Sequence, residues 1–434
     1  MTDAHRGEYD AIVIGGGPAG SAYAMTLARG GHTVLVLERE EFPRFHIGES
    51  FLPHTAEMLH QLGLLERVYA GGFATKFALE LCGGDKWSRR VAMADAGAPY
   101  RTQAPSVERA HFDKILLEAA SDEPNATVLT QARVTDLIFS GERLAGVRYL
   151  HNDESCTATA TFVVDASGRA GVVARALKLR KTDGHFKMAA IFKHFAGLDE
   201  RNNPGVPGDT QIGVADIGWV WAIPVRPDAI SVGVVVPVDM MRKSRPEDLF
   251  EAYLAKQPRI QQRLTGTEPL RPLAGEQNFE YHAEKLAGPG YFIVGDAGCF
   301  TDPVFSSGVY LGLVTGRRAA EESLACLRGE AAEANATQRY DRFFKTGYET
   351  YFRLISAHYD SRRPVQGQYL RHLFSEVDAE TKYQVLALGG DFFTQNNPCV
   401  NRLRAEKEWA LFGDFEPLYG CPVYGERPAS LLAA

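Results

Sequence analysis

A glycine-rich loop near the N-terminus does most to restrict the fold of this chain. From Gly15 to Gly20 the sequence reads Gly-Gly-Gly-Pro-Ala-Gly, between an apolar segment at 9–14 that predicts a strand and a segment at 21–29 that predicts a helix. Gly-x-Gly-x-x-Gly in this strand–turn–helix context is the fingerprint of a dinucleotide-binding Rossmann fold. The loop residues expected to meet the dinucleotide are Gly15, Gly17, Ala19 and Gly20.

An acidic residue follows where such a fold requires one. Residues 33–37 predict a second strand, which ends at Glu38. A carboxylate at that point can accept hydrogen bonds from a ribose diol. These features predict dinucleotide binding but leave the choice between FAD and NAD open.

Composition argues against several classes of protein. The chain has 434 residues, 45% of them hydrophobic, and a formal net charge of -7, which disfavours nucleic acid or an anionic membrane as the main partner. It has no long apolar run and no apolar signal segment, so we expect no membrane span and a cytoplasmic location. Its 6 cysteines include no Cys-x-x-Cys pair and its 12 histidines show no ligand spacing, so no metal site is expected.

Three further segments favour FAD. The loop from Glu41 to Ser50 is too specific in composition for a solvated connector, and two strands are expected to end at Asp165 and at the Gly-Asp-Ala run of 295–297. Together these segments resemble those of flavoproteins with the aromatic-hydroxylase fold. No second Gly-x-Gly-x-x-Gly follows a strand and opens a helix, so a built-in NAD(P)H domain is not expected.

That resemblance implies positions for the cofactor contacts. Asp296 is expected to bond the ribityl chain of FAD. Arg109, which opens a helix expected at 109–120, is expected to lie near the cofactor, as are Arg44 and Ser50 in the preceding loop.

The predicted fold class is α/β, with a Rossmann-like FAD-binding domain of the aromatic-hydroxylase type. Alternating segments in the middle of the chain predict an inserted antiparallel β-sheet on the substrate side. Aromatic residues at helical spacing after residue 330 predict a helical C-terminal region. The expected domains are 1–75, 105–180 and 285–330 for the discontinuous FAD-binding domain, 76–104 and 181–284 for the substrate-side domain, and 331–434 for the C-terminal region.

Two of the 4 tryptophans lie one residue apart, at Trp219 and Trp221. Alternate side chains of a strand share a face, so these two and Ile223 would form a bulky apolar wall. Pro224 lacks an N–H donor and is expected to end the hydrogen-bonded ladder. The simple interpretation of an isolated Trp-x-Trp is a buried core strand.

Taken with its neighbours, this segment makes the chain resemble the flavin-dependent halogenases. The Trp-x-Trp-x-Ile-Pro run of 219–224 is the hallmark of that family, and the run from Phe300 to Gly308 matches its Phe-x-x-Pro-x-x-Ser-x-Gly motif in full. Lys76 lies where members keep a catalytic lysine. The match spans residues 9 to about 320, whereas the C-terminal region resembles phenol- and pyrrole-type members only loosely.

The resemblance implies a reaction that begins with FADH2 from a separate flavin reductase. Reduced flavin and O2 would form a hydroperoxide, which chloride or bromide attacks to give hypohalous acid. The backbone amides of Ser307 and Gly308 are the expected halide donors. The ε-amine of Lys76, in a pocket that lowers its pKa, would then direct the halogen onto an electron-rich aromatic ring. Lys86 in a nearby turn is the alternative lysine.

One residue departs from the tryptophan-halogenating members of the family. Those members carry a glutamate just before the Ser-x-Gly turn, and Phe305 occupies that position here. A site without this carboxylate suits a ring that is activated by itself, so a phenol or a pyrrole, free or tethered to a carrier protein, is the expected substrate. The residues expected to form the barrier and the substrate pocket are Trp219, Trp221, Phe305 and Ser306.

The alternative function is that of an FAD-dependent aromatic hydroxylase, which passes oxygen directly to the ring. It needs the substrate close to the flavin, whereas the tryptophan wall should keep the two apart. A reductase of isoprenoid double bonds shares the fold but has no need for Lys76. A flavin-binding protein without catalysis has no need for an intact Ser-x-Gly turn.

Overall fold

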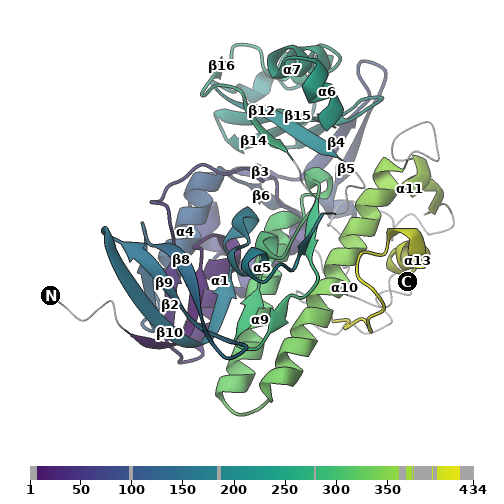
Figure 1. Ribbon diagram of the computed structural model, residues 1–434. Helices are drawn as coiled ribbons and strands as arrows, with labels where there is room; N and C mark the ends of the chain where they lie inside the picture. The colour runs from purple at the N-terminus through teal and green to yellow at the C-terminus, as the bar shows by residue number, and fades with distance from the viewer. Residues whose placement is uncertain are drawn as a thin grey trace.

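The computed structural model describes residues 7–96, 101–182, 187–277, 280–360, 368–373, 375, 393 and 398–420. These residues form a body around a largely parallel sheet, a second sheet above it, and a pair of long helices along the body (Figure 1). Both sheets collect strands from separate parts of the chain, so the chain passes between them repeatedly.

The sheet of the body has eight strands in the order β19-β20-β10-β1-β2-β7, with β9 and β8 added beside β10. β1 pairs in parallel with β10 and β2, and every residue of β2 is buried, as expected for a parallel sheet covered on both faces. The strands are β1 (Glu8–Ile14), β2 (Val34–Leu37), β7 (Ala126–Leu129), β8 (Arg133–Ser140), β9 (Arg143–His151), β10 (Glu154–Asp165), β19 (Ala287–Gly288) and β20 (Tyr291–Ile293).

Helices cover this sheet, and two of them approach each other closely. An added Cβ at Gly316 of α9 would stand 2.2 Å from the carbonyl oxygen of Ala19 in α1, so the crossing requires a residue without a side chain. This crossing holds the start of α1 in place under the glycine-rich loop. The helices are α1 (Pro18–Arg29), α2 (Pro53–Gln61), α3 (Leu65–Tyr69), α4 (Arg109–Ser121), α5 (Val172–Ala176) and α9 (Gly308–Leu327).

The upper sheet also has eight strands, in the order β16-β12-β15-β14-β13-β4-β5, with β17 beside β12. Its two faces belong to different hydrophobic cores: Phe192 and Trp221 pack with the body, whereas Ile191 and Val220 pack under three short helices (Figure 1). The elements are β4 (Ala78–Cys82), β5 (Ser88–Ala92), β12 (Met188–Ala196), β13 (Thr210–Val214), β14 (Trp219–Arg226), β15 (Ala229–Pro237), β16 (Glu268–Pro269), β17 (Ala274–Gln277), α6 (Val238–Lys243), α7 (Pro246–Leu254) and α8 (Pro258–Arg263).

The tryptophan strand is longer than the sequence predicts. β14 pairs with β15 beyond Pro224 as far as Arg226, and the register shifts between these two residues. A bulge of this kind interrupts the ladder locally, so a proline without an N–H is tolerated there. The expectation that Pro224 ends the ladder is therefore wrong. The shared face is confirmed, because Trp219, Trp221 and Ile223 belong to the same core.

Two small sheets connect the body with the upper sheet. β3 (Ala74–Lys76) pairs with β6 (Ala104–Ser106), and Ser50 joins Ser106 by an isolated antiparallel bridge. The other small sheet combines β11 (Arg180–Lys181), β18 (Tyr281–Ala283) and β21 (Cys299–Phe300).

A 27-residue helix, α10 (Glu333–Tyr359), runs beside α9 and reaches the upper sheet (Figure 1). It confirms the helix predicted from the aromatic spacing, and α11 (Gln368–Leu373) and α13 (Pro398–Ala405) follow it. The predicted α/β class with an inserted sheet and a helical C-terminal region is confirmed; several C-terminal segments lie outside the described residues. Among the described helices, none has the length and apolarity needed to cross a bilayer.

Candidate active site

The glycine-rich loop folds back on itself to form a cradle at the start of α1. Gly15 has a φ of 105°, and an added Cβ at Gly20 would stand 2.0 Å from the Gly15 carbonyl oxygen. The Glu38 carboxylate accepts a hydrogen bond from the N–H of Gly16 over 2.7 Å. The loop, the helix and the acidic residue therefore meet as a dinucleotide-binding fold requires.

Gly17 faces away from this packing. An added Cβ at Gly17 would meet only the guanidinium of Arg44, at 3.4 Å. Arg44 pairs with the buried Asp113, whose carboxylate is also held by two hydrogen bonds from Arg109. Burial acts against ionisation of Asp113, but these guanidinium groups prevail and lower its pKa. Two arginines are thus fixed beside the open side of the cradle, where pyrophosphate would lie.

Arg109 also shapes the loop that contains Ser50. Its guanidinium donates to the carbonyl oxygens of Ile47 and Gly48, at 2.6 and 3.2 Å. The loop therefore follows the start of α4. Arg44 and Arg109 meet at Asp113, whereas Ser50, further along the same loop, is held by Lys76 and by its bridge to Ser106.

Asp296 lies directly after β20, next to the carboxyl ends of the parallel strands. Burial raises the pKa of its carboxyl to about 6, although the charges of Arg109 and Arg169 act in the opposite direction. A partly buried acid near two guanidinium groups fits a polar chain such as ribityl, which can hydrogen-bond with these groups without a net charge. With the cradle at Gly17, these residues fit FAD.

Lys76 is fully buried at the end of β3, with an exposed fraction of 0%. Its Nζ donates a hydrogen bond to the Ser50 hydroxyl oxygen over 2.7 Å. Burial lowers the pKa of the ε-amine to about 7, partly offset by the charge of Asp209. Lys86, the alternative lysine, is exposed in its turn.

The burial of Lys76 depends on a close approach of two chain segments. Gly208 has a φ of 82°, and an added Cβ would stand 2.3 Å from the carbonyl oxygen of Thr75. The segment before β13 can therefore lie directly on the lysine strand and place Asp209 nearby. β3 also packs against β14, which carries the tryptophans.

The tryptophans form an aromatic wall with a member that the sequence analysis missed. The Trp221 ring lies across Gly233 of β15, where an added Cβ would stand 2.2 Å from a ring carbon. Trp221 then reaches Phe192 of β12 on one side and Trp219 on the other, with ring centroids 6.1 and 5.7 Å away. Strand pairing of Gly233 with both Trp221 and Phe192 creates this arrangement, and no local sequence pattern shows it.

The two indole N–H groups are anchored differently. Trp221 donates to the Ser231 hydroxyl at 3.1 Å, within the same sheet. Trp219 donates to the Tyr359 hydroxyl at 2.8 Å, at the end of α10. The wall is therefore fixed at one end by its own sheet and at the other by the C-terminal helix.

The predicted halide turn closes tightly before α9. Asp302 caps the turn at 303–305 by accepting from the N–H of Val304 over 2.9 Å, and Ser306 adopts a φ of 51°. Ser307 is the N-cap of α9 and Gly308 its first residue. Amides at this end of a helix have no intrahelical acceptor and lie at the positive end of the helix dipole, so they suit a bound anion.

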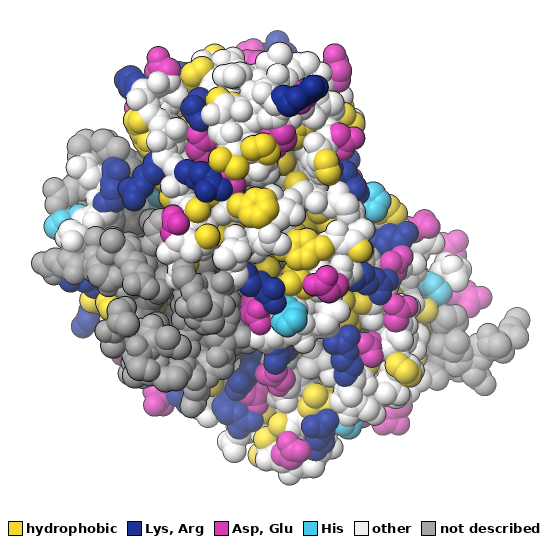
Figure 2. All heavy atoms as spheres, turned by 180° about the vertical axis from the view of Figure 1, so that it is seen from behind, with side chains coloured by type: hydrophobic (Ala, Val, Ile, Leu, Met, Phe, Trp, Pro, Cys, Tyr) yellow, Lys and Arg dark blue, Asp and Glu magenta, His cyan; other side chains and the backbone are white. Residues whose placement is uncertain are grey.

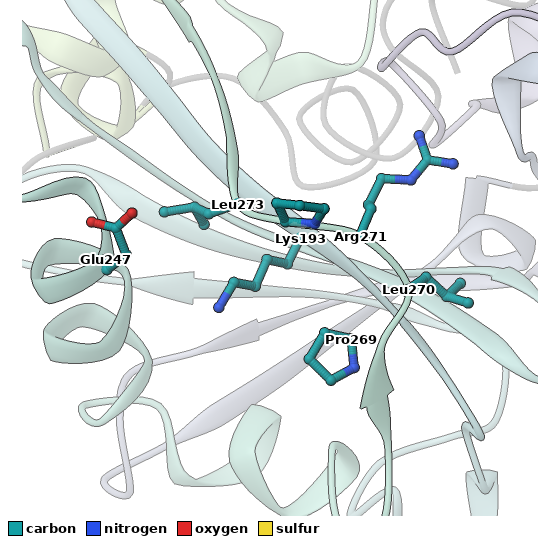
Figure 3. Close-up of a pocket in the computed structure, with 7 residues that line it drawn as sticks. Lys193, Glu247, Pro269, Leu270, Arg271 and Leu273 are labelled. Carbon is teal, nitrogen blue, oxygen red and sulfur yellow. The ribbon is translucent and has the colours of Figure 1, made fainter.

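Two hollows of the described surface adjoin the upper sheet. One of about 500 Å³ lies on the helix side of the upper sheet, where Lys193 and Glu247 line it, away from the tryptophan face (Figure 3). Another of about 70 Å³ lies between the upper sheet and the body, beside Glu49, which bonds His194 over 2.5 Å. Hydrophobic side chains gather at the junction of the two units on the face shown in Figure 2.

Comparison with known proteins agrees with this geometry. Residues 8–342 match the family of FAD binding domains. The chain is 33% identical to a tryptophan 2-halogenase of Chondromyces crocatus over 80% of this chain and 67% of that protein. It is 31% identical to a 1H-pyrrole-2-carbonyl-peptidyl-carrier-protein brominase of Pseudoalteromonas luteoviolacea, over 72% of this chain and 76% of that protein.

Solved structures give the same result. The flavin-dependent brominase Bmp2 superposes with a TM-score of 0.82 at 27% identity, covering 93% of this chain and 98% of the brominase. The myxobacterial chondrochloren halogenase CndH superposes with a TM-score of 0.76 at 28% identity, covering 93% of this chain and 97% of that protein. These relatives support the use of FAD and halide, and the chain belongs to the flavin-dependent halogenases.

Proposed function

We propose that this halogenase generates hypohalous acid and uses Lys76 to transfer its halogen to a phenol or a pyrrole. The buried Lys76 amine carries the proposal, because its low pKa makes it available in neutral form near pH 7. A neutral amine can bind or react with an electrophilic halogen, whereas a solvated surface ammonium cannot.

The cofactor contacts follow from the cradle and its acidic and basic neighbours. The amides at Gly15–Gly20 and the arginines Arg44 and Arg109 receive the pyrophosphate, Glu38 receives the ribose and Asp296 the ribityl chain. FAD, when bound and reduced, supplies with O2 the oxidising chemistry that converts halide into hypohalous acid. A separate flavin reductase is the proposed source of FADH2.

The halide is assigned to the backbone amides of Ser307 and Gly308. Ser307 is buried and Gly308 is exposed, so an anion could reach these two amides from the open side at Gly308 and be held by them as donors. The aromatic wall of Trp219, Trp221 and Phe192 then keeps the reacting ring away from the flavin. This separation favours halogenation at Lys76 over direct oxygen transfer.

The substrate ring is placed beside the wall and Phe305. An aromatic side chain at Phe305 offers ring packing but no carboxylate, which suits a ring that is already electron-rich. Relatives named for pyrrole groups on a peptidyl carrier protein support testing tethered as well as free substrates.

The test combines the protein with FAD, a flavin reductase, NADH, O2 and bromide or chloride. Phenols, pyrroles and tryptophan are supplied free, and pyrrole groups also on a carrier protein. Mass spectrometry is expected to show halogen isotope patterns on phenol or pyrrole products. A hydroxylated product without halogen would overturn the proposal in favour of the aromatic hydroxylase, and halogenated tryptophan alone would overturn the substrate class.

A further inference from the structure

The described end of α10 contacts both residues that we place beside the substrate ring. The Tyr359 hydroxyl accepts the hydrogen bond of Trp219 over 2.8 Å. The His358 ring packs edge-on against Phe305, with centroids 5.7 Å apart. The end of α10 therefore lies against both Trp219 and Phe305.

The Tyr359 hydroxyl has a carboxyl neighbour in the halide turn. This is Asp302, which is only 1% exposed and whose Oδ2, the oxygen that does not cap the turn, is buried without a hydrogen-bond partner among the described residues. Burial raises the pKa of this carboxyl to about 7, although the hydrogen bond from the Val304 amide and the neighbouring Tyr359 hydroxyl act in the opposite direction. A carboxyl in that range can both take up and release a proton near neutral pH.

Halogen transfer leaves one proton to be removed from the ring carbon. Lys76 is assigned to the halogen, and neither the indole of Trp219 nor the ring of Phe305 can accept a proton. Tyr359 can, because its oxygen accepts hydrogen bonds and its own proton can pass to the neighbouring carboxyl of Asp302. The Trp219 N–H then stabilises the charge that develops on that oxygen.

We propose that Tyr359 and Asp302 form a relay that removes the ring proton after halogen transfer, an inference that rests on the proposed function. The C–H bond of the halogenated carbon breaks and its electron pair restores the aromatic ring. The proton passes to the Tyr359 oxygen while the Tyr359 proton passes to the Asp302 carboxylate. No further oxidant or reductant is needed, and Asp302 returns the proton to water afterwards.

The structural alternative is that Asp302 only caps the turn at 303–305. A cap needs one side-chain oxygen, which asparagine also supplies. Asp302→Asn therefore keeps the cap and removes the proton acceptor, and Tyr359→Phe keeps the ring and removes the hydroxyl. Ser231→Ala is the matched control, because it removes the hydroxyl partner of the other indole, Trp221.

The experiment measures halogenation of a phenol and of the same phenol deuterated on the ring. For the wild type, and likewise for Ser231→Ala, the two phenols are expected to react at the same rate, which means no isotope effect. Asp302→Asn and Tyr359→Phe are expected to form product about 100-fold more slowly, the lower range for loss of a general base. Both are also expected to show a primary isotope effect, because proton loss becomes rate-limiting.

A change of packing alone does not create an isotope effect, so this measurement separates the two roles. Halogenation by both variants at the wild-type rate, or slower halogenation without an isotope effect, would overturn the relay while leaving the proposed function intact. A wild type that halogenates no phenol or pyrrole would overturn the proposed function and the relay with it. Flavin binding by each variant, followed by flavin fluorescence, confirms that the variants are folded.

Discussion

The ε-amine of Lys76 donates a hydrogen bond to the Ser50 hydroxyl over 2.7 Å, and both side chains are buried. A hydroxyl carries no charge, so it positions the amine without stabilising the ammonium form as a contacting carboxylate would. Among the described residues, the opposite charge that counteracts the effect of burial is that of Asp209, and burial prevails. This geometry differs from that of a structural ion pair, in which a contacting carboxylate would keep the amine charged.

Lys76→Ala is expected to remove halogenated product and to leave FAD binding and hypohalous acid formation intact. The cradle and the halide turn do not depend on the amine, so oxidant should escape and be detected by a chemical trap. Lys86→Ala is the matched control, because Lys86 is an exposed lysine of a nearby turn. Full product formation by Lys76→Ala, or its loss in Lys86→Ala, would remove Lys76 from its role.

Halogen transfer is expected to become faster as the pH rises through about 7. The folded-state pKa of Lys76 is lowered to about 7, so the amine is charged below this pH and neutral above it. The measurement follows single-turnover product formation with added hypohalous acid, so that flavin chemistry does not limit the rate. A rate that is independent of pH from 6 to 8 (about one unit on either side of the pKa) contradicts the assignment.

Lys76→Met is expected to be more stable than the wild type at low pH. Because the folded-state pKa lies below the unfolded value of 10.5, the charged amine destabilises the folded state. This destabilisation is complete below about pH 7 and disappears as the pH rises to the unfolded-state pKa of 10.5. At roughly 1.4 kcal/mol per pKa unit the difference amounts to several kcal/mol, less the lost Ser50 hydrogen bond. Urea unfolding at pH values below 7 and near 10 measures it, and an equal difference at both contradicts it.

Two glycine variants distinguish a glycine that leaves room for the ligand of the cradle from one that allows the cradle itself to pack. Gly17→Ala is expected to leave the unfolding free energy nearly unchanged but to weaken FAD binding about tenfold or more, roughly 1.4 kcal/mol. Its added Cβ meets only the Arg44 guanidinium and otherwise projects where pyrophosphate would lie. Gly20→Ala is expected to destabilise the protein itself, because its Cβ would collide with the Gly15 carbonyl oxygen. Flavin titration and urea unfolding of both variants test these expectations. Equal FAD affinity and equal unfolding free energy in the two variants would contradict them.

Gly233→Ala is expected to displace Trp221 and destabilise the fold by about 1–3 kcal/mol, the range for overpacking a core. The matched control is Gly275→Ala on β17 of the same sheet, where an added Cβ would have ordinary contacts of 3.4 Å or more. Chemical unfolding measures the difference, and trapped hypohalous acid measures leakage past the displaced wall. A Gly233→Ala protein as stable as Gly275→Ala would show that the Trp221 ring can shift without destabilising the fold.

The sequence predicts those parts of the site that depend on local backbone geometry. The cradle at 15–20, the acidic residue at Glu38 and the turn before Gly308 are short runs whose residue types match one backbone conformation each. The shared face of Trp219 and Trp221 follows from the period of a strand. Pro224 shows the limit of this reasoning, because a bulge in β14 accommodates a proline that local rules place at a strand end.

The sequence by itself therefore determined the class of fold, the dinucleotide cradle and the two family motifs, since each is written in neighbouring residues. Only the tertiary structure decided which side chains surround them. Lys76 and Ser50 are 26 residues apart, and Trp219 and Tyr359 are 140 apart. The burial of Lys76 comes from strands and loops of separate segments packing together, and burial is what lowers the pKa of its amine. The same packing brings α10 to the wall and places the Tyr359 hydroxyl between Trp219 and Asp302.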